Sequence, residues 1–208
     1  MNKKLIIVVT LLSIFTVNHV FAQSRIGVRA GANFSMMRSS MYYDQHYHGT
    51  HIGFHAGLTS EIPLSAKFYF KPGLLFSSKG YKDSGRTLNS YFIDIPLHFM
   101  FKFPVSSSAI FTHFGPCFSY GIAGNRITTI NTTSGEPIVK DEKLSFGSEV
   151  GDHMKPFDIA FDVGVGFEVK HFQFSVQYSL GLLNLEPVEP KRYSLRMSVL
   201  SVSAAYLF

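Results

Sequence analysis

Apolar and polar residues alternate strictly along most of the chain after residue 24. In the stretch RIGVRAGANFS the apolar positions include Ile26, Val28 and Ala30, whereas Arg25 and Arg29 take the other face. A period of two is the pattern of a β-strand with two chemically different faces, because successive side chains of a strand point to opposite sides. A helical period is nearly absent from the same region, so the pattern predicts an all-β fold.

Eight segments show this alternation, and the connections between them alternate in length. The segments cover residues 25–35, 50–62, 67–76, 91–103, 109–122, 157–169, 172–183 and 193–208. Short connections at 63–66, 104–108 and 170–171 alternate with longer polar ones at 36–50, 79–90, 125–156 and 184–192. Short turns at one end and long loops at the other are typical of an up-and-down transmembrane barrel. The sequence therefore predicts an eight-stranded antiparallel β-barrel.

Three positions predict local irregularities in these strands. Pro72 and Pro96 each lack a backbone N–H for the ladder, so both are expected at bulges or strand ends. In the last segment Met197 is out of phase with Leu200. A bulge near Val199 would reconcile the two halves of that segment.

Composition indicates which face of the barrel points outward. The chain has 21 Phe and 10 Tyr but no Trp, and most of the phenylalanines fall on the apolar face. The interior of an eight-stranded barrel is only wide enough for side chains to fill it, and so many rings would overfill it. The other face is rich in Gly, Ser and small polar residues. We therefore expect the rings to face lipid, where a closed barrel satisfies every backbone group internally.

The predicted lumen carries equal numbers of basic and acidic side chains. The basic residues are Arg25, Arg29, Lys67, Lys71 and Lys102, and the acidic residues are Glu61, Asp94, Asp158, Asp162 and Glu168. Buried charges need partners because an unpaired one is costly. The expectation is a salt-bridged plug, and the alternative is a pore or binding site lined by these charges.

The N-terminus has the composition of a secretory signal peptide. Two lysines precede an apolar run from Leu5 to Val17, and Ala22 stands at the expected cleavage site. The run is shorter than the roughly 20 apolar residues of a membrane-spanning helix. We therefore expect residues 1–22 to be removed and residues 23–208 to form one barrel domain. The mature chain would be mildly basic, and no basic stretch indicates nucleic acid binding.

A histidine cluster suggests a metal site, but its spacing favours another interpretation. Asp44, His46, His48, His51 and His55 fall within a short stretch. Histidines four apart on a strand are separated by about 13 Å, so His51 and His55 cannot share one ion. His46 and His48 could ligate a metal together with Asp44. The favoured interpretation is polar filler of loop and lumen, and no metal-binding residue is predicted.

Motifs for catalysis and cofactor binding are weak. No compact nucleophile motif such as Gly-x-Ser-x-Gly occurs, and GVGFE has too few glycines for a dinucleotide site. Cys117 is the only cysteine, which excludes an internal disulfide. Without a visible activating partner it is expected as a small buried lumen residue. No catalytic or cofactor-binding residue and no cofactor are therefore predicted.

The connection 125–156 is long enough to carry function. Ile127, Ile130, Ile138 and Val139 indicate strands that continue beyond the membrane as a hairpin around TTSGEP. Such a hairpin has an edge that could pair with a partner strand. The alternative is a variable external loop without such a role.

Several stretches, in their order and spacing, are similar to those of a known family. They are GVRAGANFS, GFHAGLTSEIPL, KFYFKPGLLFSSKG, YFIDIPLHFMFKF, FGPCFSYG, FDVGVGFEV, FSVQYSLGLLNL and AAYLF. Together they resemble the PorT-like outer-membrane β-barrel family of Bacteroidota. Phe208 with Tyr206 is similar to the terminal signal that the barrel-assembly machinery reads. The resemblance implies an eight-stranded barrel in the outer membrane with both termini in the periplasm, and a link to protein export through the founding member.

The sequence therefore predicts a non-enzymatic outer-membrane barrel with a polar, plugged lumen and interaction-prone external loops. An accessory role in protein export is the function that the resemblance implies. The expected partners are outer-membrane lipid, the barrel-assembly machinery during insertion and a protein at the external loops, but no nucleic acid. Two alternatives stay open, namely a small-solute or ion pore and a lipid-modifying enzyme active at the barrel rim.

Overall fold

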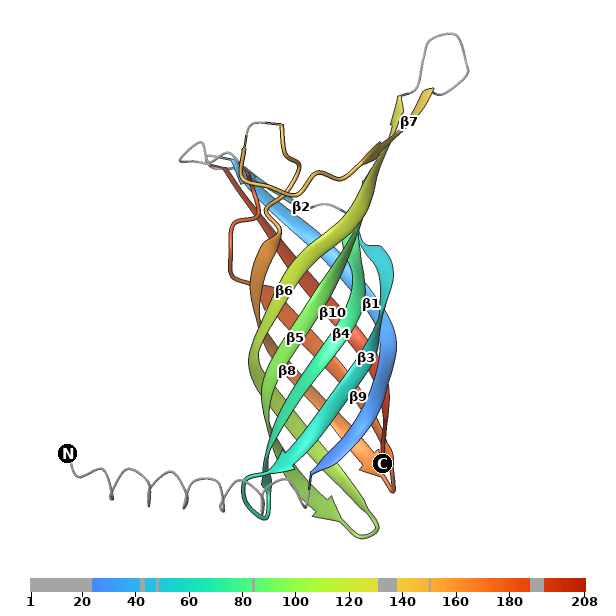
Figure 1. Cartoon of the computed structure of the whole chain (residues 1–208), viewed down its shortest axis with the longest axis vertical. Helices are drawn as coiled ribbons and strands as arrows, with labels where there is room; N and C mark the ends of the chain where they lie inside the picture. Colours follow the sequence, from blue (N-terminus) through green and yellow to red (C-terminus); the bar gives the residue numbers. More distant parts are fainter. Residues whose placement is uncertain are drawn as a thin grey trace, which may run out of the picture.

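The strands of the protein run at a slant around a single axis and close into a barrel (Figure 1). This computed structural model describes residues 24–41, 44–47, 49–83, 85–130, 138–149, 151–187 and 193–208, without the side chains of 40, 41, 44–47 and 193. The predicted signal peptide, residues 1–22, lies outside the described residues. No helix within the described ranges is long and apolar enough to cross a membrane.

The described residues form ten strands, and all paired neighbours are antiparallel. The strands are β1 (Arg25–Met41), β2 (Asp44–Tyr47), β3 (His51–Pro63), β4 (Phe68–Asp83), β5 (Arg86–Val105), β6 (Ser108–Ile130), β7 (Ile138–Lys143), β8 (Phe157–Val169), β9 (Phe172–Gly181) and β10 (Tyr193–Leu207). All except β2 and β7 belong to a ring, which the pairing of β10 with β1 closes. The predicted eight-stranded antiparallel barrel is thereby confirmed.

The tight turns and the C-terminus lie at one rim of the barrel. The turns at 64–67, 106–107 and 170–171 join consecutive strands there, and Figure 1 shows the C-terminus at the same end. The N–H of Phe208 donates to the carbonyl of Ile26 at 2.8 Å, which ties the last residue to the start of β1. Because short turns of outer-membrane barrels face the periplasm, this rim is the periplasmic one.

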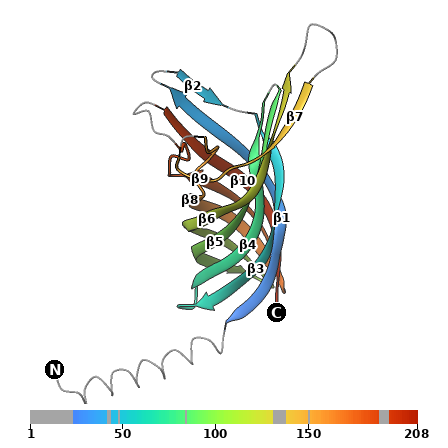
Figure 2. The ribbon, with the colours of Figure 1, turned by 45° about the horizontal axis from the view of Figure 1, so that its top comes forward.

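At the opposite, extracellular rim, several strands continue further than the sequence predicted. The predicted loop at 79–90 is wrong, since β4 and β5 stay paired as far as Asp83 and Arg86. Strand β6 also continues and pairs with β7, with Ile130 opposite Ile138, as the predicted hairpin requires. Polar composition was misleading here because the outer face of a strand above the apolar belt is polar, whereas inward residues such as Leu88 and Ser90 are buried. Figure 2 shows β2 and β7 at this rim.

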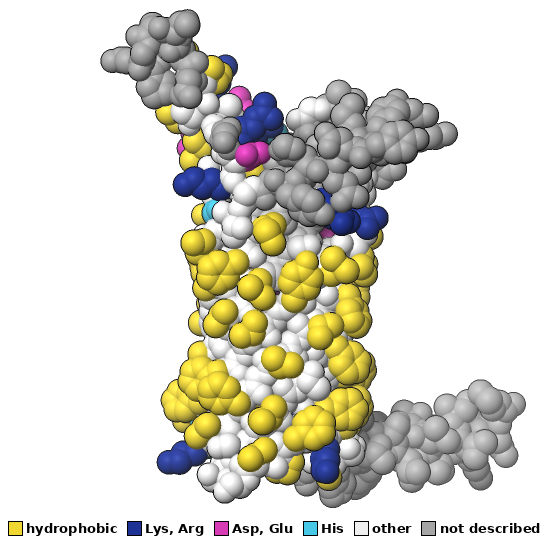
Figure 3. Space-filling model, turned by 180° about the vertical axis from the view of Figure 1, so that it is seen from behind, with side chains coloured by type: hydrophobic (Ala, Val, Ile, Leu, Met, Phe, Trp, Pro, Cys, Tyr) yellow, Lys and Arg dark blue, Asp and Glu magenta, His cyan; other side chains and the backbone are white. Residues whose placement is uncertain are grey.

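The outer surface of the barrel carries a broad apolar belt. Figure 3 shows apolar side chains over the middle of the barrel, with lysine and arginine side chains at its two edges. Outward residues such as Ile52, Phe167 and Val163 are half exposed or more, although they are large and apolar. Polar residues such as Asp162 alternate with them and are buried inside. The prediction that most of the rings face outward is confirmed, and Phe92 and Phe111 are fully buried exceptions.

The predicted bulge near Val199 is wrong. Strand β10 keeps one unbroken register with β1 from Tyr193 to Leu207. Met197 and Val199 instead point into the barrel, where both are buried. The apparent change of phase arises because the upper part of the lumen is apolar, so the inward face of β10 changes its chemistry rather than its direction.

The two prolines lie within strands and mark neither bulges nor strand ends. The pairs recorded on the two sides of Pro72 in β4 and of Pro96 in β5 keep the same register. The β5–β6 ladder shifts its register between Tyr91 and Phe92, away from both prolines. The expectation for the prolines was therefore wrong, and each interrupts a ladder only locally.

A charge on the lipid face should destabilise the barrel, and a matched charge on the hairpin should not. Val163 is 50 % exposed in the middle of β8, and Val139 is 61 % exposed on β7. We expect Val163→Arg to lower the free energy of unfolding in vesicles by about 2–4 kcal/mol, because its guanidinium enters hydrocarbon. Val139→Arg should change it by less than about 0.5 kcal/mol. Urea titration followed by gel shift measures both, and equal effects would contradict the position of the belt.

Candidate functional site

An ion-pair network crosses the lumen near its periplasmic end. Arg25 binds Glu61 at 2.6 Å and Glu168 at 2.9 Å. Lys102 binds the same two carboxylates, each at 2.6 Å. The amide of Gln173 donates to both of them, at 2.8 and 2.6 Å. Four strands thus supply two cations and two anions, which compensate one another as buried charges must.

A vestibule of about 390 Å³ adjoins this network at the periplasmic rim. Tyr69 and Pro104 line it beside the charged residues, and the Lys102 ammonium lies 4.8 Å from the centre of the Tyr69 ring. That distance allows a cation–π interaction. The lumen is therefore open to the periplasm only as far as the ion-pair network.

An amide connects cation and anion in the middle of the lumen. The Arg29 guanidinium donates to Oε1 of Gln177 at 3.1 Å, and Nε2 of Gln177 donates to Asp162 at 2.8 Å. Arg29 also donates to the Ser203 hydroxyl at 3.0 Å. Arg29 and Asp162 are both buried. Arg29 is thus neutralised through Gln177 rather than by a direct ion pair with a carboxylate.

Two stacked histidines fill the same level of the lumen. The rings of His98 and His113 lie 5.0 Å apart. Nε2 of His98 donates to Asp162 at 2.9 Å, and Nε2 of His113 donates to Gln177 at 3.1 Å. Phe111 is fully buried beside them, with its ring 6.0 Å from that of His113. These inward rings close the bore at mid-height, where small side chains alone would leave it open.

A third charged group lies nearer the extracellular rim. The Lys79 ammonium binds Asp94 at 2.8 Å and lies 5.1 Å from the centre of the Phe92 ring. Asp94 also accepts from the Ser77 hydroxyl at 2.6 Å. Lys79 had no place in the predicted lumen because residues 79–90 were expected to form a loop. The spacing from Lys71 could have revealed Lys79, because residues an even number apart on one strand point to the same face.

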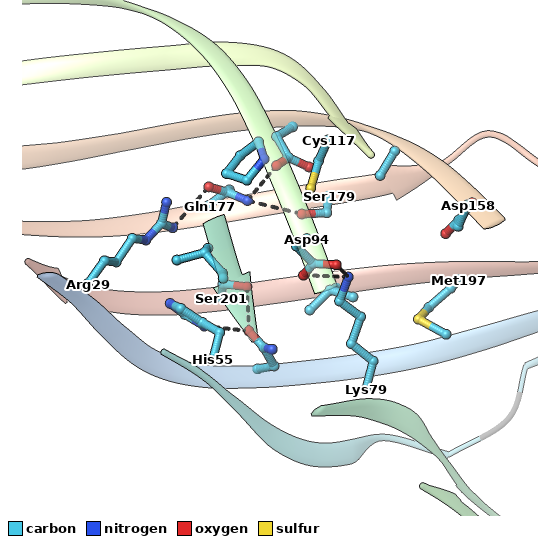
Figure 4. A pocket seen from close by; sticks show the side chains of 16 residues that line it. Arg29, His55, Lys79, Asp94, Cys117, Asp158, Gln177, Ser179, Met197 and Ser201 are labelled. Carbon is cyan, nitrogen blue, oxygen red and sulfur yellow. Dashed lines mark hydrogen bonds and ion pairs between the residues drawn. The ribbon is translucent and has the colours of Figure 1, made fainter. Parts of the chain in front are cut away.

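A cavity of about 40 Å³ lies between these groups (Figure 4). Arg29, Lys79, Asp94, Asp158 and Asp162 all line it. One carboxylate oxygen of Asp158 and one of Asp162 have no protein partner, although both are buried. A polar space of this size is large enough for water, which needs about 10–15 Å³ by the same measure. Internal water is the natural partner of these oxygens.

The extracellular end of the lumen is sealed by an apolar cluster, called the lid here. Its buried members are Met37, Leu88, Phe92, Leu144, Met154, Leu185, Met197 and Val199. The connection between β7 and β8 supplies two of these residues, and the Lys155 N–H donates to the Leu185 carbonyl at 2.9 Å. The ring of Phe146 packs directly on Gly121, where any β-carbon would clash with it. The predicted plug therefore has an apolar upper part that sequence reasoning missed.

Nine of the ten predicted lumenal charges lie in the lumen. Lys67 does not, because it is exposed in the periplasmic turn between β3 and β4. Lys71 is buried, but it donates to the amide oxygen of Gln173 and lies 5.2 Å from the centre of the Phe111 ring. With Lys79 in place of Lys67, the charges still balance. The expectation of pairwise salt bridges holds for Arg25 and Lys102 and is wrong for Arg29 and Lys71.

The histidine cluster is divided between the lumen and the rim. His55 is buried, donates from Nδ1 to Asn33 at 2.8 Å and accepts from the Ser203 hydroxyl at 2.9 Å. His51 is only half buried at the extracellular start of β3. The part of the chain that the structure describes contains no group of three possible metal ligands. His48 and the side chains of Asp44 and His46 lie outside the description.

Cys117 lies in the lumen, as predicted for a small buried residue. Its thiol is free, and it lines the cavity beside Asp94 and Asp162. The two cations that line the same cavity already have partners, since Lys79 binds Asp94 and Arg29 donates to Gln177. The carboxylates disfavour the thiolate that a nucleophile needs.

The strands close into a ring, most aromatic side chains face outward, and side chains fill the bore. These features together define an integral β-barrel of the outer-membrane type. The chain belongs to the outer membrane protein beta-barrel domain family, whose model matches residues 21–186. The protein is therefore located in the outer membrane. No curated protein matches the sequence.

Several solved structures are similar in fold at low sequence identity. The attachment invasion locus protein Ail of Yersinia pestis is 8 % identical with a TM-score of 0.44, covering 89 % of this chain and 99 % of that one. Neisserial surface protein A is 12 % identical with a TM-score of 0.43, covering 88 % and 97 %. OprG from Pseudomonas aeruginosa is 11 % identical with a TM-score of 0.42, covering 89 % and 96 %.

Removing Asp162 should destabilise the barrel strongly. Asp162→Ala removes the acceptor of His98 and the carboxylate acceptor of Gln177, and with it the negative charge that Gln177 links to Arg29. We expect the free energy of unfolding to fall by about 3 kcal/mol, as for other broken buried charge networks. Gel-shift melting in vesicles measures this effect. Asp141→Ala on the exposed hairpin is the matched control and should melt with the wild type; an unchanged melt of Asp162→Ala would contradict the lumenal network.

Proposed function

We propose that this protein is a non-conducting membrane anchor that presents an extracellular β-sheet edge to a protein partner, in an accessory role in protein export. The observation that carries the proposal is the second edge of β7, with which none of the described strands pairs. Strand β7 pairs with β6 on one side, and all six of its residues are exposed. An exposed strand edge offers a row of unpaired N–H and C=O groups to a partner strand.

The chemistry of the hairpin supports binding rather than mere exposure. Ile130, Ile138 and Val139 are 44, 50 and 61 % exposed, although they lie above the apolar belt where water surrounds them. The hairpin is also ordered by side chains, since Arg126 binds Glu142 at 2.9 Å across it. When a partner peptide adds a strand to a sheet, it binds an ordered, exposed strand edge, and nearby apolar side chains contact the peptide. The β7 edge has both features.

The filled lumen favours a non-conducting accessory protein over a channel for exported proteins. The bore is occupied at successive levels by the ion-pair network, the stacked histidines and the lid. The cavity between these groups measures only about 40 Å³. The resemblance to PorT-like barrels is what suggests protein export as the process. A barrel that itself passes nothing can still hold an exported protein or a machinery component at the cell surface.

Shortening the hairpin while keeping the lid tests the proposal. Residues 127–141 are replaced by a short turn, which leaves Leu144 and Met154 in the lid. We expect crosslinked co-purification from the outer membrane to lose one defined partner with this variant. The control is Asp141→Ala, which keeps the strand edge and should keep the partner. Recovery of the same partner by the shortened variant would contradict the role of β7.

The pore alternative predicts a different electrical behaviour. We expect no steady conductance from the purified protein in planar bilayers, because an eight-stranded bore filled by side chains leaves no continuous water path. A reproducible open level that disappears when Phe111→Trp is introduced would favour the pore. The rim-active enzyme is tested separately, by lipid mass spectrometry of a deletion strain, where a missing lipid modification would favour it.

A further inference from the structure

Two arginines face each other on the outer wall of the barrel near the extracellular rim. Arg38 of β1 and Arg196 of β10 are direct cross-strand partners. Both are exposed, whereas their chain neighbours Met37 and Met197 are buried in the lid. The alternation of the strands therefore points both guanidiniums outward, away from the lumen.

Such a pair is unfavourable unless something anionic lies between the two side chains. The β-carbons of direct partners in an antiparallel sheet are about 4.5–5.5 Å apart, and like charges placed there repel. Within the described part of the chain, no carboxylate forms an ion pair with either arginine. The repulsion is thus uncompensated by the protein residues that the structure describes.

The position of the pair indicates what kind of anion fits. On the same outward face, toward the periplasm, the next residues of β1 are Met36 and Phe34, and Leu200 lies opposite Phe34 on β10. Met36 and Leu200 are exposed members of the apolar belt. Figure 3 shows lysine and arginine side chains at this upper edge of the belt. The site therefore has two cations directly above a hydrocarbon-facing wall.

We propose that Arg38 and Arg196 bind the phosphate of an anionic lipid in the outer leaflet, whose acyl chains lie against Met36 and Leu200. Guanidinium groups recognise phosphate oxygens through paired, charge-assisted hydrogen bonds. One phosphate between the two arginines replaces their repulsion with attraction. This site is separate from the β7 edge and does not depend on the proposed function.

The test compares the stability of the protein in two membranes. Wild type, Arg38→Gln and Arg196→Gln are refolded into zwitterionic vesicles with or without bisphosphorylated lipid A. In zwitterionic vesicles we expect each variant to be as stable as the wild type or more stable, because the repulsion is relieved. With lipid A we expect the wild type to be more stable than either variant, because it binds the lipid phosphate more tightly. Native mass spectrometry should show lipid A retention reduced about tenfold in each variant, the factor of a lost charge-assisted contact.

Controls separate the lipid phosphate from other causes. Lys67→Gln removes one exposed positive charge at the periplasmic rim and should leave lipid A retention unchanged. Dephosphorylated lipid A should not stabilise the wild type more than it stabilises either arginine variant. Equal retention of lipid A by wild type and both arginine variants would overturn the proposal. An equal stabilisation of the detergent-solubilised wild type by inorganic phosphate would also overturn it, because a free anion would then suffice.

Discussion

The constraint on which this structure depends is that hydrocarbon offers no hydrogen bonds. Every backbone N–H and C=O at membrane depth must find its partner within the protein, and a ring of strands without an edge achieves this. The pairing of β10 with β1 closes the ring over the whole length of β10. Once the ring is closed, each strand has one face toward lipid and one toward a narrow bore, and the strict alternation of the sequence follows.

The narrow bore in turn decides how its charges are held. Five cations and five carboxylates cannot all meet in pairs, since each strand fixes the height of its own residues. Side-chain amides therefore connect what ion pairs cannot reach. Gln173 joins Glu61 and Glu168 to Lys71, and Gln177 joins Arg29 to Asp162. Neutral amides allow the bore to remain filled and balanced without placing every charge beside its opposite.

Sequence reasoning recovered the strands, the outward face and nine lumenal charges, because all of these follow from a period of two. It missed what depends on height along the barrel axis. Met197 and Val199 suggested a bulge because the pattern alone does not show that the lid makes the upper bore apolar. Lys79 and the start of β5 were taken for a loop because residues 79–90 are mostly polar, and the outer face of a strand above the apolar belt is polar too. The pairing of Arg38 with Arg196 could not be predicted, because it depends on the register between β1 and β10, which neither segment shows by itself.

The central claim is that phenylalanines on the two faces of one strand meet different surroundings, lipid outside and packed side chains inside. The chain has no tryptophan, so single Phe→Trp variants report on one position each. Phe114 lies on the outer face of β6, and Phe111 is fully buried in the bore. In vesicles with brominated acyl chains, the account predicts strong fluorescence quenching of Phe114→Trp and little quenching of Phe111→Trp. Equal quenching of the two, or the reverse order, would contradict it.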